Sequence, residues 1–339
     1  MPKRRDKENK FSGRYQEAMS LEKLRYPIAW DGYAETVDST ATEEIQHYLD
    51  RFGMVVIPIL SAEEQSLLLD AFFEEFNEQQ RSSATHKLSL DPLTWGSQNW
   101  PSTGPFLCQR PALGLQPTLV RTHPVIRQVF ANIFGTDELV TSIDRWGAMR
   151  GSVGVPTQQE DGSISYQDHP EWRKNLELHW DMNPFAYAQE KKVGACQHRY
   201  QALVAVLDNP KEVGGLRVVP GSHRHYLEEW AGRNKVPKGY SLTSPHSVKL
   251  PGDDPAQHLS QKIPIKAGDM VVFDSRLLHG TFQNESQSMR LVQYIRMMPI
   301  SMAEGDRFSA TQSLKKHPDW RQLFESYGLD SQARRLLGL

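Results

Sequence analysis

The chain has 339 residues and a formal net charge of −2, with 38% hydrophobic and 24% charged residues. This composition is typical of a soluble globular enzyme, and the near-neutral charge gives no electrostatic case for binding nucleic acid or an anionic membrane. Only two cysteines occur, which excludes a disulfide framework or a cysteine-rich zinc site and makes a reducing, cytoplasmic compartment the default. No apolar run approaches the roughly 20 residues that a membrane-spanning helix needs.

The first part of the chain predicts one strand and two helices. Residues 55–60 form an apolar run typical of a short buried strand. Ser61 and Glu64 then form a capping box, and apolar residues recur at three- and four-residue steps to about Gln79, which predicts a helix. A second helix is expected over residues 124–134, with a proline in its first turn and a glycine after its end.

From residue 139 onward the pattern changes to short strands separated by turns that contain glycine and proline. Helices that flank one dominant antiparallel sheet system indicate an α+β fold, and no dinucleotide or P-loop motif occurs. Strands are expected at residues 139–143 with a continuation to 149, and at 175–183, 202–207, 216–219, 263–265, 270–273 and 289–297.

We therefore expect three parts in the chain. Residues 1–40 are predicted to be a polar, partly disordered segment, residues 41–302 a single domain, and residues 303–339 a helical extension packed on that domain. Long polar stretches within a compact domain are often functional. The candidate lids of this domain are residues 81–118, 151–172 and 228–262.

His179 and Asp181 form a His-x-Asp pair in a segment typical of a strand. Alternate residues of a strand point to the same side, so this pair can present an imidazole and a carboxylate to one metal ion. With 12 histidines, chance supplies roughly one such pair. The rivals His169-Pro170-Glu171 and His317-Pro318-Asp319 each contain a central proline, which argues against a central strand.

The later part of the chain favours His179 and Asp181 over the two rival pairs as metal ligands. Gly268 and Asp269 turn the chain into an apolar strand, His279 follows at its far end, and Arg290 comes eleven residues after His279. A hairpin of this length brings Arg290 beside His279. A buried arginine needs an anionic partner, and its planar fork suits the distal carboxylate of 2-oxoglutarate. Thr281 shares the side of His279 and can add a hydroxyl donor; a structural salt bridge from Arg290 remains the alternative.

Taken together, these segments resemble the phytanoyl-CoA dioxygenase family of Fe(II)- and 2-oxoglutarate-dependent oxygenases. The resemblance extends over roughly residues 45–300 and rests on residues 53–58, His179-Trp180-Asp181, residues 214–223, and the segment from Gly268 to Arg290. It implies a double-stranded β-helix (jelly-roll, cupin-like) core flanked by helices. It also implies a metal site of His179, Asp181 and His279, with Arg290 and Thr281 binding the co-substrate. Where the best-known member has a glutamine, this chain has Trp180, so the pocket near the iron is expected to differ.

The resemblance implies oxidation, most simply hydroxylation, of an unactivated C–H bond in a small organic substrate. Fe(II), 2-oxoglutarate and O2 would take part, and succinate and CO2 would be released. Candidate pocket residues are Trp180, Arg145, Arg150 and His223, although either arginine can equally be a solvated surface residue. Three alternatives stay open: a cupin-like metal enzyme that does not use 2-oxoglutarate, a catalytically inactive jelly-roll binding module, and a zinc hydrolase. The substrate, and whether the chain is a monomer or a homodimer, are not determined by the sequence.

Overall fold

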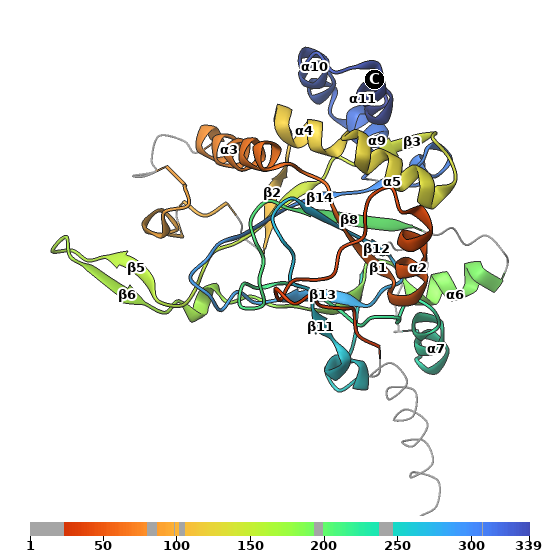
Figure 1. The fold of residues 1–339 in the computed structure, drawn as a ribbon, viewed down its shortest axis with the longest axis horizontal. Helices are drawn as coiled ribbons and strands as arrows, with labels where there is room; N and C mark the ends of the chain where they lie inside the picture. The colour runs from red at the N-terminus through yellow and green to blue at the C-terminus, as the bar shows by residue number, and fades with distance from the viewer. Residues whose placement is uncertain are drawn as a thin grey trace, which may run out of the picture.

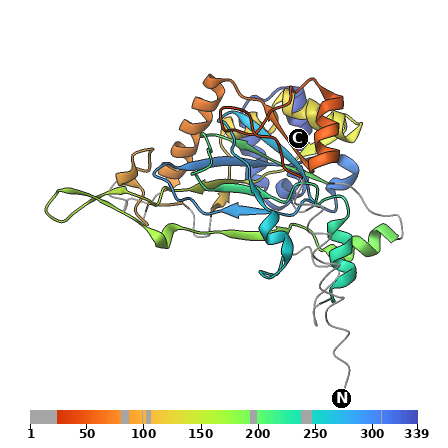
Figure 2. The same ribbon diagram turned by 60° about the horizontal axis from the view of Figure 1, so that its bottom comes forward.

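The computed structural model describes residues 24–79, 87–97, 99–101, 106–192, 199–236, 247–306 and 308–339. Within these segments two antiparallel sheets form the centre of the molecule, and helices cover the outer face of one of them (Figures 1 and 2). Figure 1 also shows a long hairpin that extends away from the sheets. The protein is therefore of the mixed helix and antiparallel sheet class.

The larger sheet has six strands: β1 (Met54–Pro58), β2 (Leu107–Pro111), β4 (Arg145–Met149), β8 (Tyr200–Ala205), β12 (Asp269–Asp274) and β14 (Arg290–Ile295). Their order is β1-β12-β8-β14-β4-β2. The smaller sheet has five strands: β7 (Leu176–Trp180), β9 (Gly215–Val218), β10 (Val248–Lys249), β11 (Gln261–Lys262) and β13 (His279–Phe282), in the order β10-β7-β13-β9-β11. Two short pairs complete the strands: β3 (Leu139–Thr141) with β15 (Met297–Pro299), and β5 (Val155–Gln158) with β6 (Ile164–Gln167).

The helices form three groups. The outer face of the larger sheet is covered by α2 (Thr42–Phe52), α3 (Ala62–Gln79), α4 (Leu115–Arg121) and α5 (Pro124–Phe134). Beside the smaller sheet lie α6 (Pro184–Lys192) and α7 (Tyr226–Arg233). The chain ends with α8 (Ile300–Ala303), α9 (Ala310–Lys316), α10 (Pro318–Ser326) and α11 (Ser331–Leu337). Among the described residues, no helix combines the length and apolar character needed to cross a bilayer.

Alternation along the strands of the larger sheet separates two hydrophobic cores. On the outer face, Val204 of β8 packs in one cluster with Phe72 of α3 and Phe130 of α5. On the inner face, Leu203 of β8 packs in another cluster with Leu216 of β9, which belongs to the smaller sheet. The inner faces of the two sheets therefore pack against each other, and polar residues between them need a specific reason to be there.

The local helix signals are confirmed by the structure. The backbone N–H of Ser61 donates to Glu64 Oε2 at 2.8 Å, and the N–H of Glu64 donates to Ser61 Oγ at 3.3 Å, which is the predicted capping box. Helix α5 has the expected bounds, and Gly135 after it has a φ of 67°. The strand expected over residues 139–149 is instead divided between two sheets, since β3 pairs with β15 and β4 pairs with β14 and β2.

The three candidate lids contain more regular structure than the sequence indicates. Residues 81–118 include β2 and the first part of α4, residues 151–172 include the β5–β6 hairpin, and residues 228–262 include most of α7 with β10 and β11. The hairpin is hard to recognise because Val155 is the one buried residue of its two strands, so its sequence lacks apolar alternation. Residues 80–86, 98, 102–105 and 237–246 of these stretches lie outside the described residues.

The beginning and end of the described chain also pack on the sheets. The leading segment was expected to be polar and partly disordered to residue 40, but Tyr26 and Val37 are buried, and the hydroxyl of Tyr26 accepts a bond from the N–H of Val56 at 3.0 Å. Residues 1–23 lie outside the described part. At the other end, Phe324 of α10 packs in one cluster with Val140 of β3.

Candidate active site

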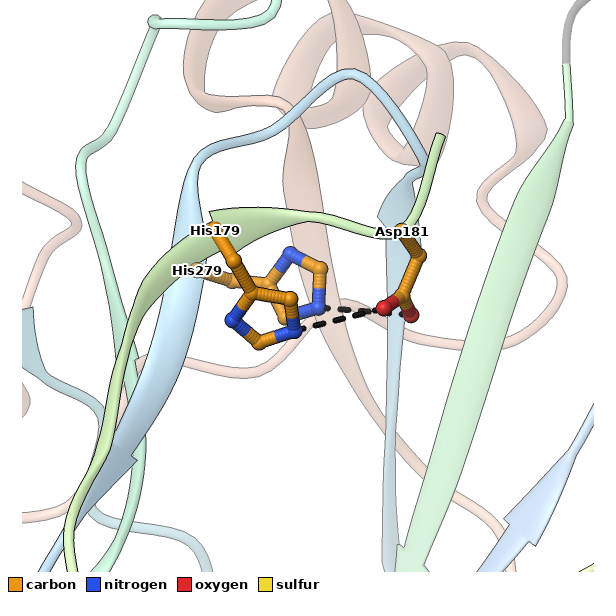
Figure 3. Close-up of side chains that lie close together, drawn as sticks. All are labelled: His179, Asp181 and His279. Atoms are coloured by element: carbon orange, nitrogen blue, oxygen red, sulfur yellow. Dashed lines mark ion pairs between the residues drawn. The ribbon is translucent and has the colours of Figure 1, made fainter. Parts of the chain in front are cut away.

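Three side chains converge where the smaller sheet ends (Figure 3). Strand β7 carries His179, and Asp181 follows directly after it on the same side. His279 begins β13 and is the direct cross-strand partner of His179. Nε2 of His179 lies 3.2 Å from Oδ1 of Asp181, and Nε2 of His279 lies 3.6 Å from Oδ2. One ligand atom from each residue can therefore meet at one ion, since these atoms all lie within 4.8 Å of one another.

The two imidazoles are oriented by their own strands. Nδ1 of His179 lies 2.8 Å from the carbonyl oxygen of Glu177, and Nδ1 of His279 lies 2.9 Å from that of Leu277. A carbonyl only accepts, so Nδ1 is the protonated nitrogen in both rings and Nε2 is directed toward Asp181. Bonds of this kind fix the tautomer and orientation of metal-binding histidines.

The carboxylate of Asp181 completes the donor set. Its side chain is 43% exposed, so it faces open space. Burial would raise the pKa of Asp181, but contact with His179 and His279 holds that pKa well below its usual range. The group is therefore anionic at neutral pH, the form that binds metals. Two imidazole nitrogens and one carboxylate fit a non-haem Fe(II) centre with open positions.

A cavity of about 420 Å³ extends from these three residues between the sheets. Arg290 and Tyr294 of β14 line it together with Thr281 of β13, and Leu203 and Leu216 add apolar surface. Arg290 and Thr281 are both buried. The cavity therefore connects the two-histidine, one-carboxylate cluster to a buried cation and a hydroxyl group.

The guanidinium of Arg290 has unused hydrogen-bonding capacity. Its side chain is 1% exposed, and Nε and Nη1 have no hydrogen-bond partner. Within the described part of the chain, Arg290 forms no ion pair, which argues against the structural salt bridge that the sequence left open. Buried donors without partners are costly, and a planar fork of this kind binds a carboxylate bidentately. The arrangement fits an anion at this end of the cavity.

A second buried basic side chain lies against Arg290. Lys262 of β11 donates through Nζ to Oδ1 of Asn209 at 3.0 Å and to the carbonyl oxygens of Val213 and Gly214 at 2.8 and 2.6 Å. Burial lowers the pKa of Lys262 well below its ordinary value, and the charge of Arg290 lowers it further. The three acceptors are neutral, so they do not balance the charge of Arg290.

Among the pocket candidates from the sequence, Arg145 lines the cavity, but Trp180 and Arg150 do not. Trp180 alternates with His179 along β7, so its side chain points to the opposite side, where it packs on Trp230 and donates through Nε1 to the carbonyl oxygen of Arg276 at 3.1 Å. Its difference from glutamine therefore does not reshape this cavity. Arg150 instead lies over the ring of Trp172, 3.7 Å from its centroid.

His223 also lies elsewhere. It lines a separate cavity together with Asp274 and Arg276, which form an ion pair of 2.5 Å. The side chain of His223 is buried there, and its Nδ1 has no hydrogen-bond partner. The physical reason is that the turn at residues 220–222 is fixed to the end of α2, where the N–H of Gly221 donates to the carbonyl oxygen of Phe52 at 2.9 Å, so His223 lies beside Gly53.

The rival His-Pro-acid motifs have local packing roles. His169 stacks on Trp172, with ring centroids 3.8 Å apart, and its Nδ1 lies 2.9 Å from Glu171. His317 stacks on Trp320 at the start of α10. Both motifs therefore lie at helix starts, as a central proline favours, and neither contributes to the metal cluster.

Sequence reasoning missed several polar residues that line the cavity. Arg296 continues the alternation of Arg290, Val292 and Tyr294 along one strand face, and this pattern was a usable signal. Gln201 is a polar residue at an inner-face position of an otherwise apolar strand. Other lining residues, which no local pattern indicates, are Arg199, Phe273, Asp306 and Phe308.

Comparison with known proteins agrees with this geometry. The family model described as Phytanoyl-CoA dioxygenase (PhyH) matches residues 30–292, so the chain belongs to this family of oxygenases. A Dictyostelium discoideum protein named "Putative phytanoyl-CoA dioxygenase" is 22% identical over 327 residues, which is 86% of each chain. The crystal structure of GlcNAc Inducible Gene 2 from Candida albicans is similar with a TM-score of 0.59 and 13% identity, covering 97% of this chain and 83% of that chain. That likeness concerns the fold alone.

Proposed function

We propose that this chain is a non-haem Fe(II)- and 2-oxoglutarate-dependent dioxygenase that hydroxylates an unactivated C–H bond of a small organic substrate, with release of succinate and CO2. In this proposal the paired sheets form a double-stranded β-helix core, also called a jelly roll, with the metal at its mouth. The observation that supports it most is the buried guanidinium of Arg290, whose Nε and Nη1 have no hydrogen-bond partner, in the same cavity as His179, Asp181 and His279.

Each residue has a defined task. His179 and His279 would bind Fe(II) through Nε2 and Asp181 through a carboxylate oxygen, which leaves the opposite face of the metal accessible. Arg290 would bind the distal carboxylate of 2-oxoglutarate, and the hydroxyl of Thr281 would donate to the same group. Fe(II), 2-oxoglutarate and O2 supply the oxidising chemistry when bound.

The surroundings of Arg290 favour an anionic co-substrate. Lys262 lies beside it, and burial together with the charge of Arg290 lowers the pKa of Lys262, so a bound carboxylate would favour the charged form of both groups. Leu203 and Leu216 border the same space and exclude water from it. The salt link to a bound carboxylate is then stronger than it would be in water.

The test is the dependence of 2-oxoglutarate binding on the metal, measured by calorimetry without oxygen. We expect Fe(II) to tighten binding by about tenfold or more, because the co-substrate then contacts both the metal and Arg290. His279→Ala should lose this effect, whereas His317→Ala, a histidine of a rival motif, should keep it. A zinc hydrolase or a cupin-like enzyme of another kind would bind metal without this dependence, and an inactive binding module would bind neither ligand; either result refutes the proposal.

A further inference from the structure

The cavity has a polar wall that the metal ligands and Arg290 do not explain. This wall combines charged and amide side chains from β4, β8, the end of β14 and the segment that follows α8. Its members are Asp144, Arg145, Arg199, Gln201, Arg296 and Asp306.

Strand register places this wall near the metal ligands and away from Arg290. Gln201 of β8 pairs with Phe273 of β12, and the ring of Phe273 lies 5.0 Å from that of His279. Arg290, in contrast, pairs with Met149 at the far end of β4. A co-substrate that reaches from the metal to Arg290 therefore leaves the space beside Gln201 free for a substrate.

The wall carries an excess of positive charge. Asp181 and Arg290 aside, the cavity is lined by three arginines and two aspartates. Asp306 is already neutralised, since Arg296 lies 3.3 Å and Arg199 3.8 Å from its Oδ2. Asp144 accepts a bond at 2.8 Å from the backbone N–H of Arg145, not from its guanidinium.

Arg145 is the cation of this wall that has no anionic partner. Within the described part of the chain its guanidinium forms no ion pair or hydrogen bond, although the residue is only half-buried and lines the cavity. Gln201 presents a second unused donor, because its Nε2 is buried without a hydrogen-bond partner. Arg145 and Gln201 both line this cavity, and a charged donor together with an amide donor matches an acceptor with two oxygens.

We propose that the substrate carries a carboxylate, which Arg145 binds through its guanidinium and Gln201 through its amide. Arg199, at 44% side-chain exposure, adds positive charge toward solvent. The cavity of about 420 Å³ must hold the co-substrate as well, so the remaining space suits a small organic acid. This inference rests on the proposed function, because the remaining space is defined by a co-substrate held at the metal and Arg290.

The test uses the full chain, saturated with Fe(II) and 2-oxoglutarate under anaerobic conditions. The probes are benzoate against benzamide, and hexanoate against hexanamide, pairs of similar size and shape in which a neutral amide replaces the carboxylate. Binding is followed by the change that each probe causes in the charge-transfer absorption of the iron and 2-oxoglutarate complex. We expect each carboxylate to bind at least about tenfold more tightly than its amide.

Matched variants test whether the preference for carboxylates over amides comes from Arg145 and Gln201 in the cavity wall. Arg145→Gln should reduce the carboxylate preference to near unity, and Gln201→Leu should weaken it. Arg321→Gln, an exposed arginine on α10, should leave it unchanged. Retention of the absorption band in each variant shows that it is folded and loaded. The inference is overturned if wild type shows no carboxylate preference, including the case in which no probe binds, or if Arg145→Gln keeps it. If the band itself never forms, the proposed function fails instead.

Discussion

His279 lies directly opposite His179 across the β7–β13 ladder, and each ring is held by the carbonyl oxygen two residues before it in its own strand. The geometry of the candidate metal centre is therefore set by the pairing of two strands. The register shifts immediately beyond this pair, between His279 and Thr281. Substitutions that separate β7 from β13 at this register shift should therefore weaken metal binding, even though they alter none of the metal-binding side chains.

Gly280 is the residue whose substitution tests this dependence. A Cβ at this position would lie 2.5 Å from the carbonyl oxygen of Leu176 and 2.9 Å from that of Glu177, which orients His179. We expect Gly280→Ala to weaken Fe(II) binding by about tenfold to a hundredfold, as measured by anaerobic titration. Gly252→Ala is the control, because a Cβ there meets nothing within 4 Å. Unchanged affinity in Gly280→Ala would show that the pairing does not set the site.

Arg290→Met should abolish 2-oxoglutarate binding and increase the stability of the ligand-free protein. The substitution removes a buried cation that has two unpartnered nitrogens and lies beside Lys262. Without ligands, we expect the variant to gain about 1–3 kcal/mol in free energy of unfolding, measured by denaturant titration. 2-Oxoglutarate should no longer stabilise it. Arg321→Met should change neither quantity. A large loss of stability in Arg290→Met would instead identify a structural role for the arginine.

Gly215→Ala should damage co-substrate binding while leaving metal binding intact. Gly215 has a φ of 128°, and a Cβ on it would lie 2.7 Å from Nε of Arg290 and 2.9 Å from Nζ of Lys262. An added methyl group therefore displaces the guanidinium from its place. We expect the dissociation constant for 2-oxoglutarate to rise by about tenfold or more, with Fe(II) affinity near that of wild type. Equal losses for both ligands would point to general disruption of the fold.

His223 should make stability depend on pH. Burial lowers the pKa of His223 from 6.5 to about 4, near Asp274 and Arg276. As the pH falls from 6.5 toward 4, the unfolded chain binds a proton at this residue before the folded chain does, so stability is lost. The loss is about 2 kcal/mol at pH 5 and absent above pH 7.5.

His223→Gln, which cannot titrate, is the matching variant. Its stability should fall less than that of wild type between pH 7.5 and 5 in denaturant titrations. If the two chains lose the same free energy of unfolding over this range, the protonation of His223 is not responsible.

Local patterns predicted the parts of the structure that depend on neighbouring residues. The capping box of Ser61 and Glu64 and the bounds of α5 follow from signals within a few positions. The alternation that puts His179 and Asp181 on one side also turns Trp180 to the other side, against Trp230, so Trp180 is not the pocket residue that the sequence predicts.

Contacts that depend on distant segments were not predictable. Lys262 meets Arg290 only because β11 pairs with β9 and the chain from Asn209 to Gly214 supplies the acceptors. No local sequence pattern predicts the contact between Lys262 and Arg290. Likewise, Asp306 reaches the cavity wall through its pairing with Arg296 beyond the end of β14.

The most direct test of the central claim is an anaerobic titration of the full chain with Fe(II) and 2-oxoglutarate, followed by visible absorption. Chelation of the metal by the keto acid gives a charge-transfer band only when both ligands occupy one site. We predict a saturable band with one equivalent of each in wild type, and a much higher 2-oxoglutarate requirement in Arg290→Met. Absence of the band in wild type, with metal bound, would contradict the account.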